Sequence, residues 1–201
     1  MRIIAGTAKG RVLRSLKGLA LRPTADRVRE AVFAMLVERV PGARFLDLFA
    51  GAGGVGLEAL SRGAAQAVFV ESHRPAARVI EENVARCGLA DRARVLALPV
   101  ARALAVLLRE GARFDLIFLD PPYERGEVGA VMARLGQRAE LLAPGGLVVC
   151  QRSRHEDPGE TVGALGRMRE ARFGETRVDF YARRSEQPGG EPGQRAGRPG
   201  R

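Results

Sequence analysis

Blocks of apolar and polar residues alternate along residues 44–183 and predict strands and helices in turn. Short apolar runs predict strands over residues 44–49, 67–70, 94–98, 114–119 and 147–151. Apolar residues at helical spacing predict helices over residues 55–62, 75–87, 100–109 and 126–138. This repetition predicts an α/β fold with a doubly wound, mostly parallel, Rossmann-like sheet. A ligand is expected at the carboxyl ends of its strands.

The end of this region has a different pattern. A weak helical pattern covers residues 161–165, and two strands are predicted over residues 168–173 and 176–183. Gly174 and Glu175 between them predict a tight turn, which makes the last strand antiparallel to its neighbour. The predicted sheet therefore has seven strands, with a late antiparallel strand.

The first 43 residues predict a smaller unit. Residues 2–5 and 11–14 predict a short hairpin whose turn is bounded by Gly6 and Gly10. A helix is predicted from Pro23 and Thr24 to about residue 40, because apolar residues recur there at helical spacing.

Charge is concentrated in this N-terminal part. The 201 residues carry 33 Lys+Arg and 23 Asp+Glu, a net charge of +10, and residues 1–44 hold ten basic and three acidic side chains. Such an excess indicates a polyanionic partner and contacts to phosphates. The residues expected to contact phosphates of this partner are Arg2, Lys9, Arg11, Arg14, Arg22, Arg27 and Arg29. The alternatives are a solvated basic face, or pairing of Arg27 and Arg29 with Asp26 or Glu30.

Three parts are therefore expected: a basic extension over residues 1–43, an α/β domain over residues 44–184 and a tail over residues 185–201. The tail contains five Gly and three Pro and almost nothing apolar, so we expect it to be disordered. The chain has no apolar run of membrane-spanning length and no signal-peptide pattern, and its two Cys and two His residues do not suggest a zinc site. We expect a cytoplasmic protein without a metal.

A glycine-rich loop follows the first predicted strand of the α/β domain. Gly51, Gly53 and Gly56 satisfy the pattern G-x-G-x-x-G between a strand and a helix, which lets the backbone approach a nucleotide closely. Glu71 ends the next strand, where a carboxylate can accept hydrogen bonds from ribose hydroxyls. NAD would fit these features, but Asp47 beside the loop would repel a pyrophosphate and instead suits the cationic cofactor S-adenosylmethionine. The candidate cofactor-binding residues are Asp47, Phe49, Gly51, Gly53, Gly56, Glu71 and Ser72.

The fourth predicted strand of the α/β domain ends in the most specific motif of the chain, Asp120-Pro121-Pro122-Tyr123. The amino group of a nucleobase is a poor nucleophile because its lone pair is delocalised into the ring. Asp120 and the carbonyl of Pro121 can accept its hydrogens, the prolines fix the turn, and Tyr123 offers a face for stacking. We expect Asp120, Pro121, Pro122 and Tyr123 to form the catalytic motif.

Several segments together resemble the bacterial 16S rRNA guanine-N2 methyltransferases. These are MRIIAGTAKGR, LRPTADRVREAVFAML, FLDLFAGAGGVGLEALSRGA, FDLIFLDPPY and GETRVDFY, which cover residues 1–182 in order. The resemblance implies a class I methyltransferase domain over residues 44–184, S-adenosylmethionine as methyl donor and a guanine N2 amine as acceptor. It assigns catalysis to residues 120–123 and cofactor binding to Asp47, Gly51, Gly53 and Glu71.

The resemblance implies 16S rRNA or the assembling 30S subunit as partner, and we expect a monomer. The modified guanine and the group that contacts the cofactor adenine stay open, since residues 98–101 lack the acidic side chain found there in many such enzymes. Two alternatives are an adenine-N6 DNA methyltransferase, in which the same Asp-Pro-Pro-Tyr motif is common, and a binding protein without turnover.

Overall fold

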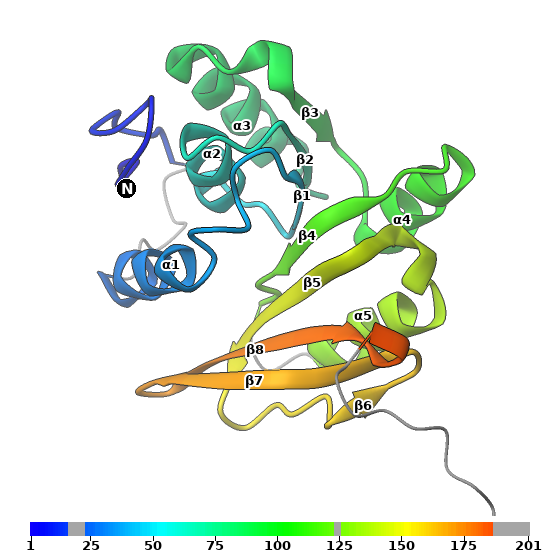
Figure 1. The fold of residues 1–201 in the computed structure, drawn as a ribbon. Helices are drawn as coiled ribbons and strands as arrows, with labels where there is room; N and C mark the ends of the chain where they lie inside the picture. The colour runs from blue at the N-terminus through cyan, green and yellow to red at the C-terminus, as the bar shows by residue number, and fades with distance from the viewer. Residues whose placement is uncertain (16–22, 123–125, 187–201) are drawn as a thin grey trace, which may run out of the picture.

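The computed structural model describes residues 1–15, 23–122 and 126–186 (Figure 1). In this part of the chain, eight strands form one sheet in the order β3-β2-β1-β4-β5-β8-β7-β6. The strands are β1 (Arg44–Leu48), β2 (Gln66–Val70), β3 (Ala93–Leu96), β4 (Phe114–Leu119), β5 (Leu142–Ser153), β6 (Thr161–Val162), β7 (Leu165–Phe173) and β8 (Thr176–Arg183). β1 to β5 pair in parallel, whereas β6, β7 and β8 pair antiparallel.

Helices cover both faces of the sheet, as the doubly wound prediction requires. The five helices of the described residues are α1 (Pro23–Met35), α2 (Gly54–Ser61), α3 (Arg74–Cys87), α4 (Val100–Arg109) and α5 (Glu127–Gln137). Three 3-10 turns lie at Ala90–Arg92, Ala139–Leu141 and Arg184–Glu186. α1, α2 and α3 pack in one apolar cluster, and α4 and α5 pack in another on the opposite face (Figure 1). The predicted fold class is confirmed.

The sequence placed β1 to β4 and α2 to α5 within two residues of their observed bounds. The prediction of seven strands is wrong, because residues 161–165 form β6 and the start of β7 instead of a helix. Thr161 and Val162 pair with Gly166 and Leu165 across a turn at Gly163, whose φ is +58°. A β-branched pair followed by a glycine therefore gives a tight hairpin here. β5 also begins earlier than predicted, because Leu142 already pairs with Phe114.

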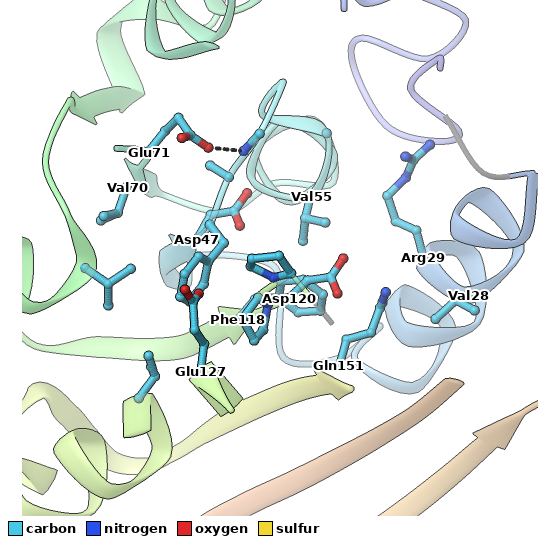
Figure 2. A pocket seen from close by; sticks show the side chains of 18 of the residues that line it. Val28, Arg29, Asp47, Val55, Val70, Glu71, Phe118, Asp120, Glu127 and Gln151 are labelled. Carbon is cyan, nitrogen blue, oxygen red and sulfur yellow. Dashed lines mark hydrogen bonds between the residues drawn. The ribbon is translucent and has the colours of Figure 1, made fainter. Parts of the chain in front are cut away.

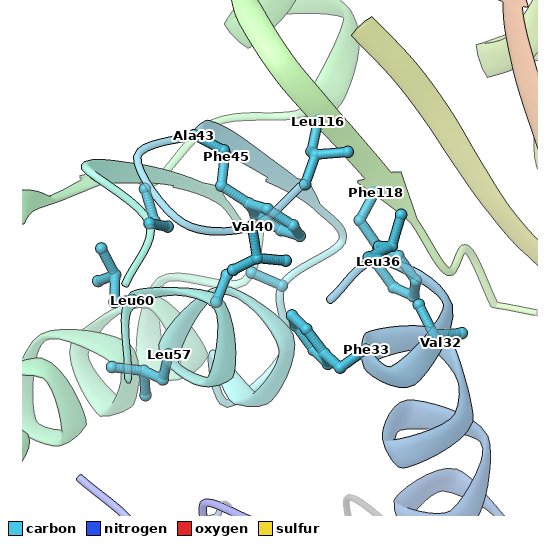
Figure 3. Packing of buried hydrophobic residues seen from close by; sticks show 14 of the residues in the cluster. Val32, Phe33, Leu36, Val40, Ala43, Phe45, Leu57, Leu60, Leu116 and Phe118 are labelled. Atoms are coloured by element: carbon cyan, nitrogen blue, oxygen red, sulfur yellow. The ribbon is translucent and has the colours of Figure 1, made fainter. Parts of the chain in front are cut away.

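The helix of the N-terminal extension ends at Met35 and not at residue 40 as predicted. Val40 nevertheless stays buried, because the chain continues in turns that direct it onto the sheet. Phe33 of α1 stacks on Phe45 of β1 with ring centroids 6.4 Å apart, in the cluster of Figure 3. The apolar residues at helical spacing include Val28, Val32, Leu36 and Val40, which are all buried, but this spacing did not predict the end of the helix.

The predicted hairpin of the extension consists of a single antiparallel bridge between Arg2 and Val12. Its backbone is fastened to α2 by buried polar side chains. Glu58, which is fully buried, accepts hydrogen bonds from the backbone N–H groups of Ile4 at 2.8 Å and Ala5 at 3.0 Å. Glu58 also accepts one from Arg62 Nε at 2.7 Å, so that its charge is compensated.

Asn83 of α3 makes a second attachment. Its side chain accepts a hydrogen bond from the Arg14 N–H at 2.8 Å and donates to the carbonyls of Arg14 and Ala52, each at 3.0 Å. Ala52 belongs to the glycine-rich loop. The extension and the loop are therefore joined through one buried amide, a contact that the sequence did not suggest.

Two glycines of α5 allow a matched test of how this helix packs on the β6–β7 hairpin. A Cβ at Gly136 would lie 2.1 Å from the carbonyl oxygen of Val162, whereas a Cβ at Gly129 would meet nothing within 4 Å. We expect Gly136→Ala to lower the free energy of unfolding by about 1–3 kcal/mol through overpacking. Gly129→Ala should raise it by about 0.5–1 kcal/mol through helix propensity. Urea denaturation measures both, and equal effects would contradict the close contact.

Candidate active site at the carboxyl edge of the sheet

A cleft of about 1630 Å³ lies at the carboxyl ends of β1, β2, β4 and β5 (Figure 2). The turn between β7 and β8 also lines it, because β8 runs antiparallel and begins at this edge. α1 contributes Val28, Arg29 and Val32 to the wall. The cleft is thus where a doubly wound sheet is expected to bind its ligand.

Asp47 is a buried carboxylate at the end of β1, with 2% of its surface exposed. Its Oδ2 accepts a hydrogen bond from the Gly56 N–H of α2 at 2.8 Å. The pKa of Asp47 is raised from 3.8 to about 7, chiefly because the carboxylate is buried. The Gly56 hydrogen bond lowers this pKa, and the negative charges of Asp120 and Glu71 contribute to raising it. A cation bound beside Asp47 would relieve this unfavourable ionisation.

The glycine-rich loop turns through left-handed backbone conformations. Phe49, Gly51 and Gly53 have φ values of +64°, +58° and +81°. Phe49 is the single non-glycine residue with positive φ in the described part of the chain, and it lines the cleft. This unfavourable conformation in a bulky residue at a cleft is typical of a functional site.

Glu71 supports the loop from the end of β2. Its Oε2 accepts a hydrogen bond from the Gly51 N–H at 3.0 Å, the dashed line in Figure 2, and its Oε1 accepts one from the His73 N–H at 2.7 Å. Ser72 is exposed and lines the cleft. Gly56 serves the packing of α2 on the sheet, since a Cβ there would lie 2.3 Å from the Phe69 ring.

The predicted catalytic motif follows β4, next to Asp47 in the sheet. Leu119 pairs with Leu48, so Asp120 leaves the sheet beside the glycine-rich loop. Asp120 is half-buried, Pro121 is buried and Pro122 is exposed, and all three line the cleft. Tyr123 lies outside the described residues. The structure thus brings Asp47, Glu71 and Asp120 to one cleft, as the sequence predicted.

Sequence reasoning missed the side of the cleft beyond Asp120. Gln151 of β5, Phe173 at the end of β7 and Thr176 at the start of β8 line it. Gln151 is a polar residue near the carboxyl end of the otherwise apolar strand predicted over residues 147–151, and that pattern could have identified it. The contribution of β8 could not be foreseen, because it requires knowing which strand β8 pairs with.

The candidate RNA-binding cations lie in three kinds of surroundings. Arg2, Lys9, Arg11 and Arg27 are exposed. Arg14 is exposed, but it forms an ion pair with Glu82 at 2.5 Å. Arg22 lies outside the described residues.

Arg29 is buried, pairs with Asp26 at 3.2 Å and donates to the Arg2 carbonyl at 2.8 Å. For Arg29 the geometry therefore supports the alternative of pairing within the helix rather than contact with an outer phosphate.

Among the described residues, no group of three or more His, Cys, Asp and Glu side chains could hold a metal ion. No helix in the same part of the chain is long and apolar enough to cross a membrane.

Comparisons with known proteins relate most of the chain to one family. The family model described as conserved hypothetical protein 95 matches residues 1–182. The putative rRNA methyltransferase YlbH of Bacillus subtilis is 37% identical over 184 residues, which cover 92% of this chain and 100% of that protein. Ribosomal RNA small subunit methyltransferase D of Escherichia coli is 41% identical over 126 residues, 63% of this chain and 62% of that protein.

Two solved structures are also similar. The putative methyltransferase yhhF from Escherichia coli superimposes with a TM-score of 0.77 and 33% identity, covering 91% of this chain and 97% of that one. The second is the 16S rRNA N2 G1207 methyltransferase of Thermus thermophilus in complex with AdoMet and guanosine. It superimposes with a TM-score of 0.63 and 26% identity, covering 84% of this chain and 44% of that one.

The raised pKa of Asp47 predicts an effect on stability that depends on pH. Because the folded-state pKa of about 7 exceeds the ordinary value of 3.8, the wild type loses stability as the pH rises from about 4 through 7. Asp47→Asn can still accept the Gly56 hydrogen bond but carries no charge. We expect the ligand-free variant to melt at least about 2–4 °C above the wild type at pH 8, and equally at pH 4. A difference independent of pH would contradict the assignment.

Proposed function

Because the chain belongs to the family described as conserved hypothetical protein 95, we propose that it transfers a methyl group from S-adenosylmethionine to the N2 amine of a guanine in 16S rRNA. The observation that carries the proposal is the position of Asp120, which leaves β4 beside Asp47 in one cleft. The relatives YlbH and ribosomal RNA small subunit methyltransferase D are named as rRNA methyltransferases, and a structurally similar 16S rRNA methyltransferase was solved with AdoMet and guanosine. The N2 position is suggested by the resemblance and by the guanosine-bound relative.

The residues on the β1–β2 side of the cleft fit the cofactor. Asp47 is a buried carboxylate that is costly to ionise without a cation, and S-adenosylmethionine carries a sulfonium and an amino group. Glu71 and the loop residues Phe49 and Gly51 line the cleft, so a nucleoside can approach the backbone of the loop closely. When bound, the cofactor supplies an electrophilic methyl group.

The chain's own contribution to transfer is positioning. Asp120 accepts a hydrogen bond from one N–H of the guanine amine, and the carbonyl of Pro121 accepts one from the other N–H. Together they orient the nitrogen lone pair toward the methyl carbon. Asp120 then accepts the proton that the amine releases. In this proposal Tyr123 stacks on the base, which must be exposed or flipped out of the RNA to reach it.

The basic extension provides the surface for RNA. Arg2, Lys9, Arg11 and Arg27 are exposed cations on a segment that docks on α2 and α3, next to the cleft that α1 lines. These cations neutralise backbone phosphates and contribute affinity without reading sequence.

The alternative of an adenine-N6 DNA methyltransferase is tested with labelled methyl transfer. Unmodified 16S rRNA, assembled 30S subunits and duplex DNA are offered as acceptors, and the products are digested and analysed as nucleosides. We expect N2-methylguanosine from one of the two rRNA substrates. N6-methyladenine in DNA, or cofactor binding without transfer to any acceptor, would contradict the proposal.

Replacement of Asp120 tests its catalytic role. We expect Asp120→Ala to lower the single-turnover transfer rate at least about a hundredfold, because the amine loses its acceptor. The affinity for S-adenosylmethionine, measured by calorimetry, should change less than about threefold. Asp47→Ala is the matched control and should weaken cofactor binding first. Equal loss of both properties in Asp120→Ala would assign Asp120 to the cofactor pocket instead.

Neutralising Arg2, Lys9 and Arg11 together tests the RNA surface. For each phosphate that the variant no longer neutralises, the log–log salt slope of RNA binding should fall by roughly 0.7–0.9. The control neutralises three exposed arginines on the α4–α5 side, Arg109, Arg113 and Arg138. The control and the variant of the extension then have the same net charge. If the control lowers the slope as much as the variant of the extension does, the extension is not the RNA surface.

A further inference from the structure

Gln151 stands beside the proposed catalytic carboxylate in the sheet. Leu119 of β4 pairs with Cys150 of β5, so the next residues along the two parallel strands are Asp120 and Gln151. Gln151 is 8% exposed and lines the cleft. Figure 2 shows the side chains of Asp120 and Gln151 directed into the same space. A buried polar side chain therefore lies one strand further from the cofactor loop than Asp120.

Both side chains face the helix that belongs to the basic extension. Leu119 and Cys150 point into the cluster with α4 and α5, whereas Phe118 and Val149 point to the side of α1 and α2. Because side chains alternate along a strand, Gln151 lies on the same face as Val149. Val28 and Val32 of α1 line the cleft on that face. A planar base that reaches Asp120 from this side has apolar residues of α1 on one flank and Gln151 at its edge.

The hydrogen-bonding edge of guanine matches this pair of groups. Next to the N2 amine, guanine presents the N1–H donor and then the O6 acceptor. A glutamine amide contains one acceptor and one donor group side by side, so that it can accept from N1–H and donate to O6 together. Asp120 would meanwhile hold the amine hydrogens. Adenine offers an unprotonated N1 and no O6 along the corresponding edge, and it can engage the amide by a single hydrogen bond at most.

Resting on the proposed function, we propose that Gln151 is a specificity-determining residue that binds the N1–H and O6 edge of the acceptor guanine. Because Gln151 belongs to β5, the base is then selected by a residue of the sheet and not by the basic extension.

The experiment compares guanine with 2-aminopurine, which keeps the N2 amine but lacks N1–H and O6. A short RNA that contains the guanine methylated by the wild type is synthesised with either base, and single-turnover transfer is measured at saturating cofactor. We expect the wild type to prefer guanine by about ten- to a hundredfold. Gln151→Met keeps the length of the side chain without its amide and should reduce that preference to below about threefold.

The matched control is Gln66→Met, which should keep the wild-type preference. Gln66 is exposed and begins β2, so it lies at the amino ends of the parallel strands, away from the cleft. Cofactor affinity and the melting temperature establish that each variant is folded. If Gln151→Met slows both RNAs equally, or if it keeps the preference, Gln151 does not read the base. Should that variant fail to fold, equal rates of the wild type on the two RNAs would overturn the inference. A wild type that methylates no rRNA guanine would instead overturn the proposed function, and the inference with it.

Discussion

Two carboxylates at the ends of neighbouring parallel strands determine what this cleft can bind. Asp47 ends β1 and Asp120 follows β4, and their proximity is one reason why the pKa of Asp47 is raised to about 7. Two negative charges in a partly desolvated space favour a cation between or beside them. The pairing of β1 with β4, which builds the core of the sheet, therefore also makes its carboxyl edge favourable for a positively charged ligand.

The N-terminal extension belongs to the same rigid layer as the glycine-rich loop. Glu58 is buried and accepts hydrogen bonds from two backbone N–H groups of the extension. Asn83 links the Arg14 backbone to Ala52 of the loop. Leaving such buried polar groups without hydrogen-bond partners costs free energy. Detachment of the extension would therefore also destabilise α2 and the loop. The extension and the glycine-rich loop are consequently parts of one packed unit.

The sequence predicted the fold and part of the site, because these features depend on residues that are close together along the chain. Strand–loop–helix patterns around Asp47 and Asp120 depend on nearest neighbours, and these were placed within two residues. The strand at Thr161, the end of α1 at Met35 and the burial of Arg29 depend on contacts between distant segments. Thr176 joined the site through the antiparallel pairing of β8 with β5, which residue patterns do not encode.

The reversed direction of β8 has a consequence for how such a protein can diversify. The turn at Gly174 and Glu175 lies at the rim of the cleft, and a Cβ at Gly174 would meet nothing within 4 Å. A short turn on the surface tolerates insertions, while β1, β2 and their loop are locked in the parallel core. Lengthening this one turn would remodel the wall of the cleft at β7 and β8 and leave the wall at β1 and β2 unchanged. The architecture thus lets one wall of the cleft change in evolution independently of the other.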